Sequence, residues 1–149
     1  MRKAAFVLAL LLGATAAEAQ LPFLRKRDAQ PQQQPVPQGI DALRAEFAAQ
    51  SGGMMVYFGS ESTLLGPPAR TALTLQAAWL RRHPEVVVRI EGYGDSLDTR
   101  DHALAVGARR AEEVRSYLVL LGVPAAQVST TSWGKERPGL GRAVTVLVR

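Results

Sequence analysis

Apolar and polar stretches alternate from Met54 to the end of the chain, and the alternation predicts a run of strands and helices. Apolar, β-prone segments predict strands at residues 54–58, 86–90, 128–133 and 143–148. Residues 86–90 are too continuously apolar for an edge strand that faces solvent. Two helical patterns fall between these strands. The order strand, helix, strand, helix, strand, strand predicts an α/β (α+β) domain: one sheet of about four strands with helices packed on one face.

The two helical patterns have recognisable starts and ends. Pro67 and Pro68 are typical of a helix start, and the first helix should stop before Pro84. Thr99 is the expected N-cap of the second, which Gly122 should end. The apolar face predicted for the first helix consists of Leu73, Leu75, Ala77, Trp79 and Leu80. For the second it consists of Leu104, Ala108, Ala111, Val114, Leu118 and Leu121.

Three segments precede this domain, which we place at residues 54–149. Residues 1–19 carry two basic residues, an apolar run and an Ala-Glu-Ala end, which predicts a signal peptide and export. Residues 20–39 are rich in Gln and Pro and predict a flexible tether. Residues 40–53 predict a short amphipathic helix, with Ile40, Leu43 and Phe47 on one face, and a linker. The sequence does not show whether this helix packs on the domain.

Cysteine and charge exclude several classes of function. The chain has no cysteine, which excludes disulfides and thiolate metal sites and predicts the absence of a covalent lipid anchor. The net charge of +5 is modest, and no dense basic stripe with interleaved aromatic residues is present. Together with export, this makes nucleic acid an unexpected partner.

Asp95 and Arg110 form the main candidate binding site. Asp95 lies in a polar loop between a predicted strand and the start of the second helix, where free N–H groups attract anions. Arg110 shares a helical stripe with Ala103 and Gly107, two small residues that should leave its guanidinium accessible. A ligand with both charges suits this pair: its ammonium would meet Asp95 and its carboxylate Arg110. The alternative is a plain surface ion pair between the two residues.

A metal site and a hydrolase site are weaker interpretations of the same loop. Asp95, Asp98, Asp101 and His102 offer metal donors, but their spacing matches no calcium loop, and acids are favoured at a helix start anyway. Ser96 with His102 lacks a nucleophile elbow and an oxyanion-hole motif. We therefore expect neither a metal nor a cofactor, and no catalysis.

Several motifs spread over most of residues 54–149 fit one family pattern. They are Glu91-Gly92-Tyr93, Asp95, Thr99, Val106-Gly107-Ala108-Arg109-Arg110-Ala111, Tyr117-Leu118, Gly122-Val123 and Ser132-Trp133-Gly134-Lys135-Glu136-Arg137-Pro138. Together they resemble the OmpA-like peptidoglycan-binding domain, and in particular its peptidoglycan-associated (Pal) lipoprotein branch. The resemblance implies that Asp95 and Arg110 hold the diaminopimelate of the peptidoglycan stem peptide, with help from Thr99 and Arg142. It also implies a periplasmic protein, at or near the outer membrane, with peptidoglycan and other envelope proteins as partners.

The chain departs from the family pattern at four places. Ala103 replaces a helix asparagine, Asp98 a loop glycine and Tyr93 a histidine, and Arg142 alone remains of an Asn-Arg-Arg triplet. Each lost hydrogen bond is worth about 0.5–1.5 kcal/mol. Two functional hypotheses follow: non-catalytic binding of peptidoglycan in the cell envelope, or an OmpA-like protein-interaction module that has lost this binding.

Overall fold

The computed structural model describes residues 39–137 and 142–149 and confirms the predicted α/β fold. Along the chain come α1 (Ile40–Gln50), β1 (Met55–Tyr57), α2 (Pro67–Arg82), β2 (Val88–Tyr93), α3 (Arg100–Leu120), the 3₁₀ helix η2 (Ala125–Gln127), β3 (Val128–Gly134) and β4 (Arg142–Leu147). The pattern had not predicted η2. The predicted signal peptide (1–19) and all but the last residue of the predicted tether (20–39) lie outside the described residues. None of the helices in the described part is long and apolar enough to cross a membrane.

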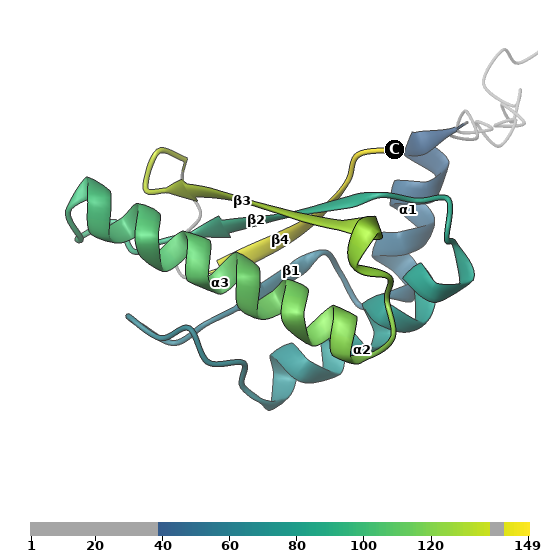
Figure 1. Ribbon diagram of the computed structural model, residues 1–149, viewed down its shortest axis with the longest axis horizontal. Helices are drawn as coiled ribbons and strands as arrows, with labels where there is room; N and C mark the ends of the chain where they lie inside the picture. Colours follow the sequence, from purple (N-terminus) through teal and green to yellow (C-terminus); the bar gives the residue numbers. More distant parts are fainter. Residues whose placement is uncertain (1–38, 138–141) are drawn as a thin grey trace, which may run out of the picture. The chain divides into compact units, whose positions relative to one another are not determined.

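The four strands form one sheet in the order β1-β4-β2-β3 (Figure 1). β2 is parallel to β3 and antiparallel to β4, and β4 is antiparallel to β1. The apolar run at residues 86–90 thus leads into an inner strand, as predicted. A parallel pair needs a long crossover, which α3 provides between β2 and β3. The carboxyl ends of β2 and β3 therefore meet at one sheet edge, where α3 begins.

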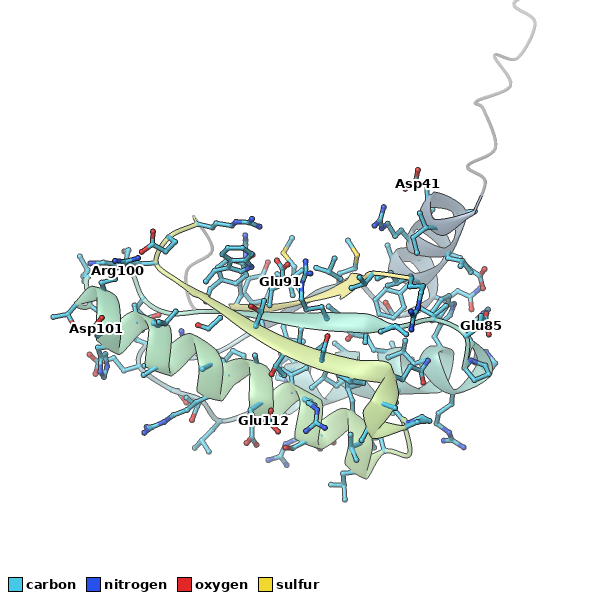
Figure 2. All side chains as sticks on the ribbon, turned by 45° about the horizontal axis from the view of Figure 1, so that its top comes forward. Asp41, Glu85, Glu91, Arg100, Asp101 and Glu112 are labelled. Carbon is cyan, nitrogen blue, oxygen red and sulfur yellow. The ribbon has the colours of Figure 1, made fainter. Side chains whose placement is uncertain are left out.

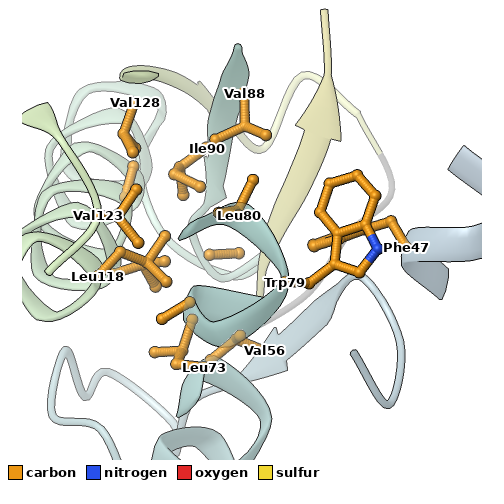
Figure 3. Close-up of a cluster of buried hydrophobic side chains, with 14 of the residues drawn as sticks. Phe47, Val56, Leu73, Trp79, Leu80, Val88, Ile90, Leu118, Val123 and Val128 are labelled. Carbon is orange, nitrogen blue, oxygen red and sulfur yellow. The ribbon is translucent and has the colours of Figure 1, made fainter. Parts of the chain in front are cut away.

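The core lies between the sheet and the two long helices, α2 and α3 (Figure 3). Alternate residues of β2, Val88 and Ile90, point into it, because side chains alternate across a strand. Trp79 is fully buried, as predicted for a core residue. Other large side chains that are fully buried there include Phe47, Val56, Leu73, Leu80, Val86, Leu118 and Leu147.

The predicted helix faces were partly wrong. Leu75 and Leu104 are 45% and 46% exposed, and Ala108 is exposed as well. The buried stripe of α3 consists instead of Ala103, Val106, Gly107, Arg110, Ala111, Val114 and Leu118. A hydrophobicity count overlooks this stripe because two of its members, a glycine and an arginine, are not apolar side chains.

α1 packs on the core, which answers the question that the sequence left open. Phe47 is fully buried, with its ring edge-on to Trp79 at a centroid distance of 5.1 Å. The indole Nε1 of Trp79 donates a hydrogen bond to Glu46 at 3.1 Å. Arg44 donates to the carbonyl oxygen of Leu147 at 3.1 Å, which ties the helix to the end of β4.

Candidate functional site

The structure brings Asp95 and Arg110 together at the start of α3. One nitrogen of the guanidinium, Nη1, lies 3.1 Å from Oδ1 of Asp95. The arginine side chain is fully buried, whereas that of Asp95 is 20% exposed. The pair is therefore not the surface ion pair that the sequence left as an alternative: one partner lies inside the protein and the other at its rim.

Two glycines allow this arrangement. A Cβ atom on Gly92 of β2 would collide with the carbonyl oxygen of Gly107 on α3, so neither position has room for a side chain. The helix backbone consequently rests directly on the strand. This contact places Arg110, one turn further along α3, under the loop that carries Asp95.

The guanidinium of Arg110 is already bound to the protein itself. Its Nε donates to the carbonyl oxygen of Ser62 at 2.8 Å, and its Nη2 to that of Gly59 at 3.1 Å. Its Nη1 donates to the carbonyl oxygen of Tyr93 at 2.8 Å and to Asp95. Four of the five N–H donors of an arginine are thus in use. The expectation that small neighbours leave this guanidinium accessible was wrong, because their stripe faces the sheet.

The turn Gly59–Ser62 is the part of the site that sequence reasoning missed. Its Ser62 N–H donates to the carbonyl oxygen of Gly59 at 3.0 Å, and Glu61 adopts the left-handed conformation with φ 51°. The backbone N–H of Glu61 donates to Oδ2 of Asp95 at 2.8 Å. Asp95 and Arg110 together therefore fix this turn. In the sequence it is only a polar loop, and its backbone contacts leave no side-chain signal.

These contacts keep Asp95 ionised. The hydrogen bond from the Glu61 N–H lowers the pKa of the Asp95 carboxyl, partial burial opposes this, and Arg110 lowers the pKa further. The pKa of Asp95 lies below its ordinary value as a result. A carboxylate at the rim of a binding site is then available to a cation over the whole neutral range.

A hollow of about 310 Å³ opens beside Asp95. Ligand pockets typically start near this size, about 300 Å³. Among the described residues, seven line it, of which three are acids, Glu61, Asp95 and Asp98, and none is basic. The remaining four are Phe58, Ser60, Ser96 and Leu97.

Thr99 and Arg142, the other two predicted site residues, do not line this hollow. Thr99 is the N-cap of α3, as predicted, and its hydroxyl accepts a hydrogen bond from the His102 N–H at 3.3 Å. Arg142 lies with its guanidinium 5.4 Å from the centre of the Tyr93 ring. Because Ala143 and Thr145 point into the core, alternation along β4 puts Arg142 on the sheet face opposite the helices.

A second polar cluster occupies that opposite sheet face. Glu91 is only 5% exposed, and Figure 2 shows it on the side of the sheet turned away from α3. It accepts hydrogen bonds from Arg89 at 2.8 Å and from the Tyr93 hydroxyl at 3.0 Å. Burial alone would raise the pKa of Glu91, but these bonds outweigh it and the pKa is lowered. Nearby, the guanidinium of Arg137 lies 3.5 Å from the centre of the Trp133 ring.

The side chains considered as metal ligands, Asp95, Asp98, Asp101 and His102, do not gather around a common point. Within residues 39–137 and 142–149, no group of three or more acidic or histidine side chains could hold an ion. The closest approach is that of His102 Nε2 to Oδ2 of Asp98, at 3.7 Å. Ser96 lines the hollow, and the structure records no hydrogen bond between it and His102 in the described part of the chain.

Comparison with known proteins decides the family. The sequence model of the OmpA family matches residues 57–144, more than half of the chain. The chain belongs to the OmpA family. Its residues 57–144 run from the end of β1 through the Asp95 loop and α3 into β4, so the matched region contains the whole candidate site.

Relatives of this OmpA-family chain include two peptidoglycan-associated lipoproteins. That of Agrobacterium fabrum is 42% identical over 86 residues, which are 58% of this chain and 49% of the relative. That of Pseudomonas aeruginosa is 40% identical over 99 residues, 66% of this chain and 58% of the relative. The chain thus matches about half the length of these curated relatives. Their shared name describes an association with peptidoglycan and not a catalytic activity.

Solved structures agree with the family. The crystal structure of the peptidoglycan-associated lipoprotein from Burkholderia pseudomallei superimposes with a TM-score of 0.63 at 33% identity, covering 65% of this chain and 92% of that one. The C-terminal domain of Helicobacter pylori MotB gives a TM-score of 0.59 at 18% identity, covering 64% and 84%. At that identity the MotB likeness shows the fold alone.

Proposed function

We propose that this OmpA-family domain binds peptidoglycan without catalysis and helps to organise the cell envelope. The observation that carries the proposal is the hollow at Asp95, where an ionised, partly exposed carboxylate is held by the Glu61 N–H and Arg110. Such a carboxylate suits an ammonium group. The diaminopimelate of a stem peptide provides one, and relatives named for their association with peptidoglycan support the assignment.

The roles within the site follow the sequence-based assignment with one qualification. Asp95 takes the ammonium. Arg110 has a single N–H donor left for a ligand carboxylate unless the Gly59–Ser62 turn moves. Contact of Thr99 or Arg142 with the ligand stays a prediction, since neither residue lines the hollow.

Sedimentation with purified sacculi tests the proposal. We expect the full chain to pellet with sacculi and Asp95→Asn to remain in the supernatant, because the substitution removes the charge that holds the ammonium. Asp101→Asn is the matched control: it removes a carboxylate from the first turn of the same helix, outside the hollow. Arg110→Ala is a poor choice, because it removes the donor of three carbonyl oxygens, that of the buried Tyr93 among them, and would destabilise the fold.

Two other outcomes identify the alternatives. If the wild-type protein does not pellet, the domain is a protein-interaction module of the envelope, as the substitutions at Ala103 and Asp98 would allow. If soluble fragments of the wall appear in the supernatant, the protein digests peptidoglycan and the non-catalytic assignment is wrong.

The setting of this function is also a proposal. A signal peptide at residues 1–19 would deliver the protein to the periplasm, and a tether at residues 20–39 would carry the domain. Peptidoglycan and neighbouring envelope proteins, at or near the outer membrane, are the partners that fit this arrangement. Because Phe47 belongs to the core, we propose to count α1 with the domain.

A further inference from the structure

The sheet has a second face, which α2 and α3 do not cover. The core fills the space between these helices and the other face (Figure 3). Because side chains alternate across a strand, the neighbours of the core residues point away from the helices, and Figure 2 shows Glu91 there. We call this second face the open face. Its strand residues are Met55 and Tyr57 of β1, Arg89, Glu91 and Tyr93 of β2, Thr131 and Trp133 of β3, and Arg142, Val144 and Val146 of β4.

The accessible charge of the open face is positive. Glu91 is the one acid among these strand residues; it is 5% exposed and accepts a hydrogen bond from Arg89 at 2.8 Å. Arg89 and Glu91 therefore neutralise each other. Arg142 of β4 and Arg137, which lies over the ring of Trp133, add two cations. A surface with an excess of one charge attracts a partner of the opposite charge.

Arg137 is well placed to meet an anion. It is exposed, and its guanidinium lies 3.5 Å from the centre of the Trp133 ring. Stacking on a ring uses the flat side of a guanidinium, whereas its N–H groups lie in the plane and point outward. Two such N–H groups match two oxygen atoms of one phosphate. Arg137 therefore presents a donor group that is already oriented for a phosphate.

Apolar side chains accompany these cations on the open face. Met55 and Tyr57 of β1 are 43% and 64% exposed, and Val144 and Val146 of β4 are partly buried. Tyrosine, with an apolar ring and a polar hydroxyl, is typical of the boundary between lipid and water. Arginine is attracted to the anionic headgroups at that boundary. A flat face of this composition suits a lipid surface, which adapts to long side chains and needs no matching shape.

We propose that the open face docks the domain on an anionic phospholipid membrane, with Arg137 and Arg142 at the lipid phosphates and Tyr57 among the headgroups. This surface is separate from the hollow at Asp95, because none of the residues that line the hollow belongs to the open face. Docking on lipid therefore does not depend on peptidoglycan binding. An acidic polymer of the cell wall is the alternative partner for the same charge.

Co-sedimentation with lipid vesicles tests the proposal. The protein is the chain from Gln20, so that the apolar run at residues 4–12 cannot contribute to binding. The vesicles consist of phosphatidylcholine alone, or of phosphatidylcholine and phosphatidylglycerol in equal parts. We expect binding to the mixed vesicles only. This binding should weaken as salt is added, because exposed charges are screened.

Matched arginine variants show whether the open face is responsible. Arg137→Gln and Arg142→Gln should each weaken binding to the mixed vesicles by about fivefold, the usual effect of one cation at such a surface. Arg109→Gln removes the same charge from an exposed position of α3 and should change binding by less than about twofold. Thermal unfolding of each variant checks the fold. If Arg142→Gln is unfolded, Arg137→Gln and Tyr57→Ser, both at exposed positions, replace it, and Tyr57→Ser should weaken binding by about threefold.

Trp133 gives a direct readout of contact with lipid. The chain has two tryptophans: Trp79 is fully buried in the core, whereas Trp133 belongs to the open face. Lipid chains that carry bromine quench the fluorescence of a nearby indole. Mixed vesicles of such lipids should therefore lower the fluorescence of the protein, and Trp133→Phe should abolish the decrease.

Other results would overturn the proposal. Equal binding to both kinds of vesicle, or binding to neither, would exclude docking on anionic lipid. Equal losses for Arg109→Gln and Arg137→Gln would assign the attraction to the overall charge of the protein. If Arg25→Gln, Lys26→Gln and Arg27→Gln together remove binding while Arg137→Gln does not, the preceding segment binds the lipid. If Arg137→Gln weakens binding to purified sacculi and not to vesicles, the open face contacts the wall and not the membrane.

Discussion

Asp95 contributes to the stability of the fold as well as to the candidate site. Its two carboxylate oxygens accept hydrogen bonds from the Glu61 N–H and from Arg110, so the charged form is favoured in the folded protein. A carboxyl whose pKa is lowered on folding contributes stability above its unfolded pKa of about 3.9, and this contribution is lost as pH falls through the folded pKa. The loss of stability at acidic pH should therefore depend on this residue.

We predict that Asp95→Asn lowers the free energy of unfolding by about 1.5–3 kcal/mol at pH 7, the usual worth of hydrogen bonds to a charged group. Below the unfolded pKa the gap between the two proteins should shrink, because wild-type Asp95 becomes protonated too. Urea titrations at pH 7 and at about pH 3 measure both gaps. A gap of equal size at both pH values would contradict the assignment of the effect to this charge.

The same residues show what sequence can reveal about a site. Asp95 and Arg110 were found from their loop and helix positions, and the structure does bring them together. The Gly59–Ser62 turn was missed because it acts through backbone groups. The saturation of Arg110 was missed for the same reason: three of its four acceptors are carbonyl oxygens, which any residue supplies.

The packing of α3 on β2 depends on glycine at a place where no turn requires it. Gly92 and Gly107 let the helix backbone rest on the strand, and the buried arginine one turn further depends on that closeness. Adding a methyl group at such a contact forces the two elements apart.

We predict that Gly92→Ala lowers the free energy of unfolding by about 1–3 kcal/mol or more, because its Cβ would collide with the carbonyl oxygen of Gly107. Gly59→Ala is the matched control. A Cβ there would meet only the Cβ of Ser62, at 3.6 Å, so we expect a change within about 0.5 kcal/mol. Chemical denaturation of both variants gives the comparison, and equal stability of the two would show that the close approach is not needed.

At the level of elements, the sequence predicted the type and order of the strands and helices far better than the faces that the helices bury. Every predicted strand and long helix is present, with ends shifted by two or three residues at most, because β-prone runs, prolines and the Thr99 cap are local signals. The buried face of α3 was misassigned at Leu104 and Ala108, because it is set by the neighbouring strand. The strand order β1-β4-β2-β3 depends on long-range pairing and was not predicted at all.

At the level of the whole molecule, α1 joins the segment predicted as a tether to the core of the domain. The rings of Phe47 and Trp79 are in contact, and the ring of His83 stacks on that of Trp79 at a centroid distance of 3.9 Å. Glu46 binds the Trp79 indole, and its Oε1 lies 3.5 Å from His83 Nε2. α1 therefore completes the core next to α2, although it lies outside the part of the chain that the family match covers.

We predict that a chain beginning at Met54 is less stable than one beginning at Gly39 by at least about 3–5 kcal/mol, the usual cost of removing a buried phenylalanine. Thermal and urea unfolding of the two chains measure the difference. Phe47→Ala in the longer chain should account for most of it, because Phe47 is the fully buried residue of α1. Equal stability of the two chains would mean that the core closes without α1. In that case the domain would begin at Met54, and the helix would serve only to connect it to the preceding segment.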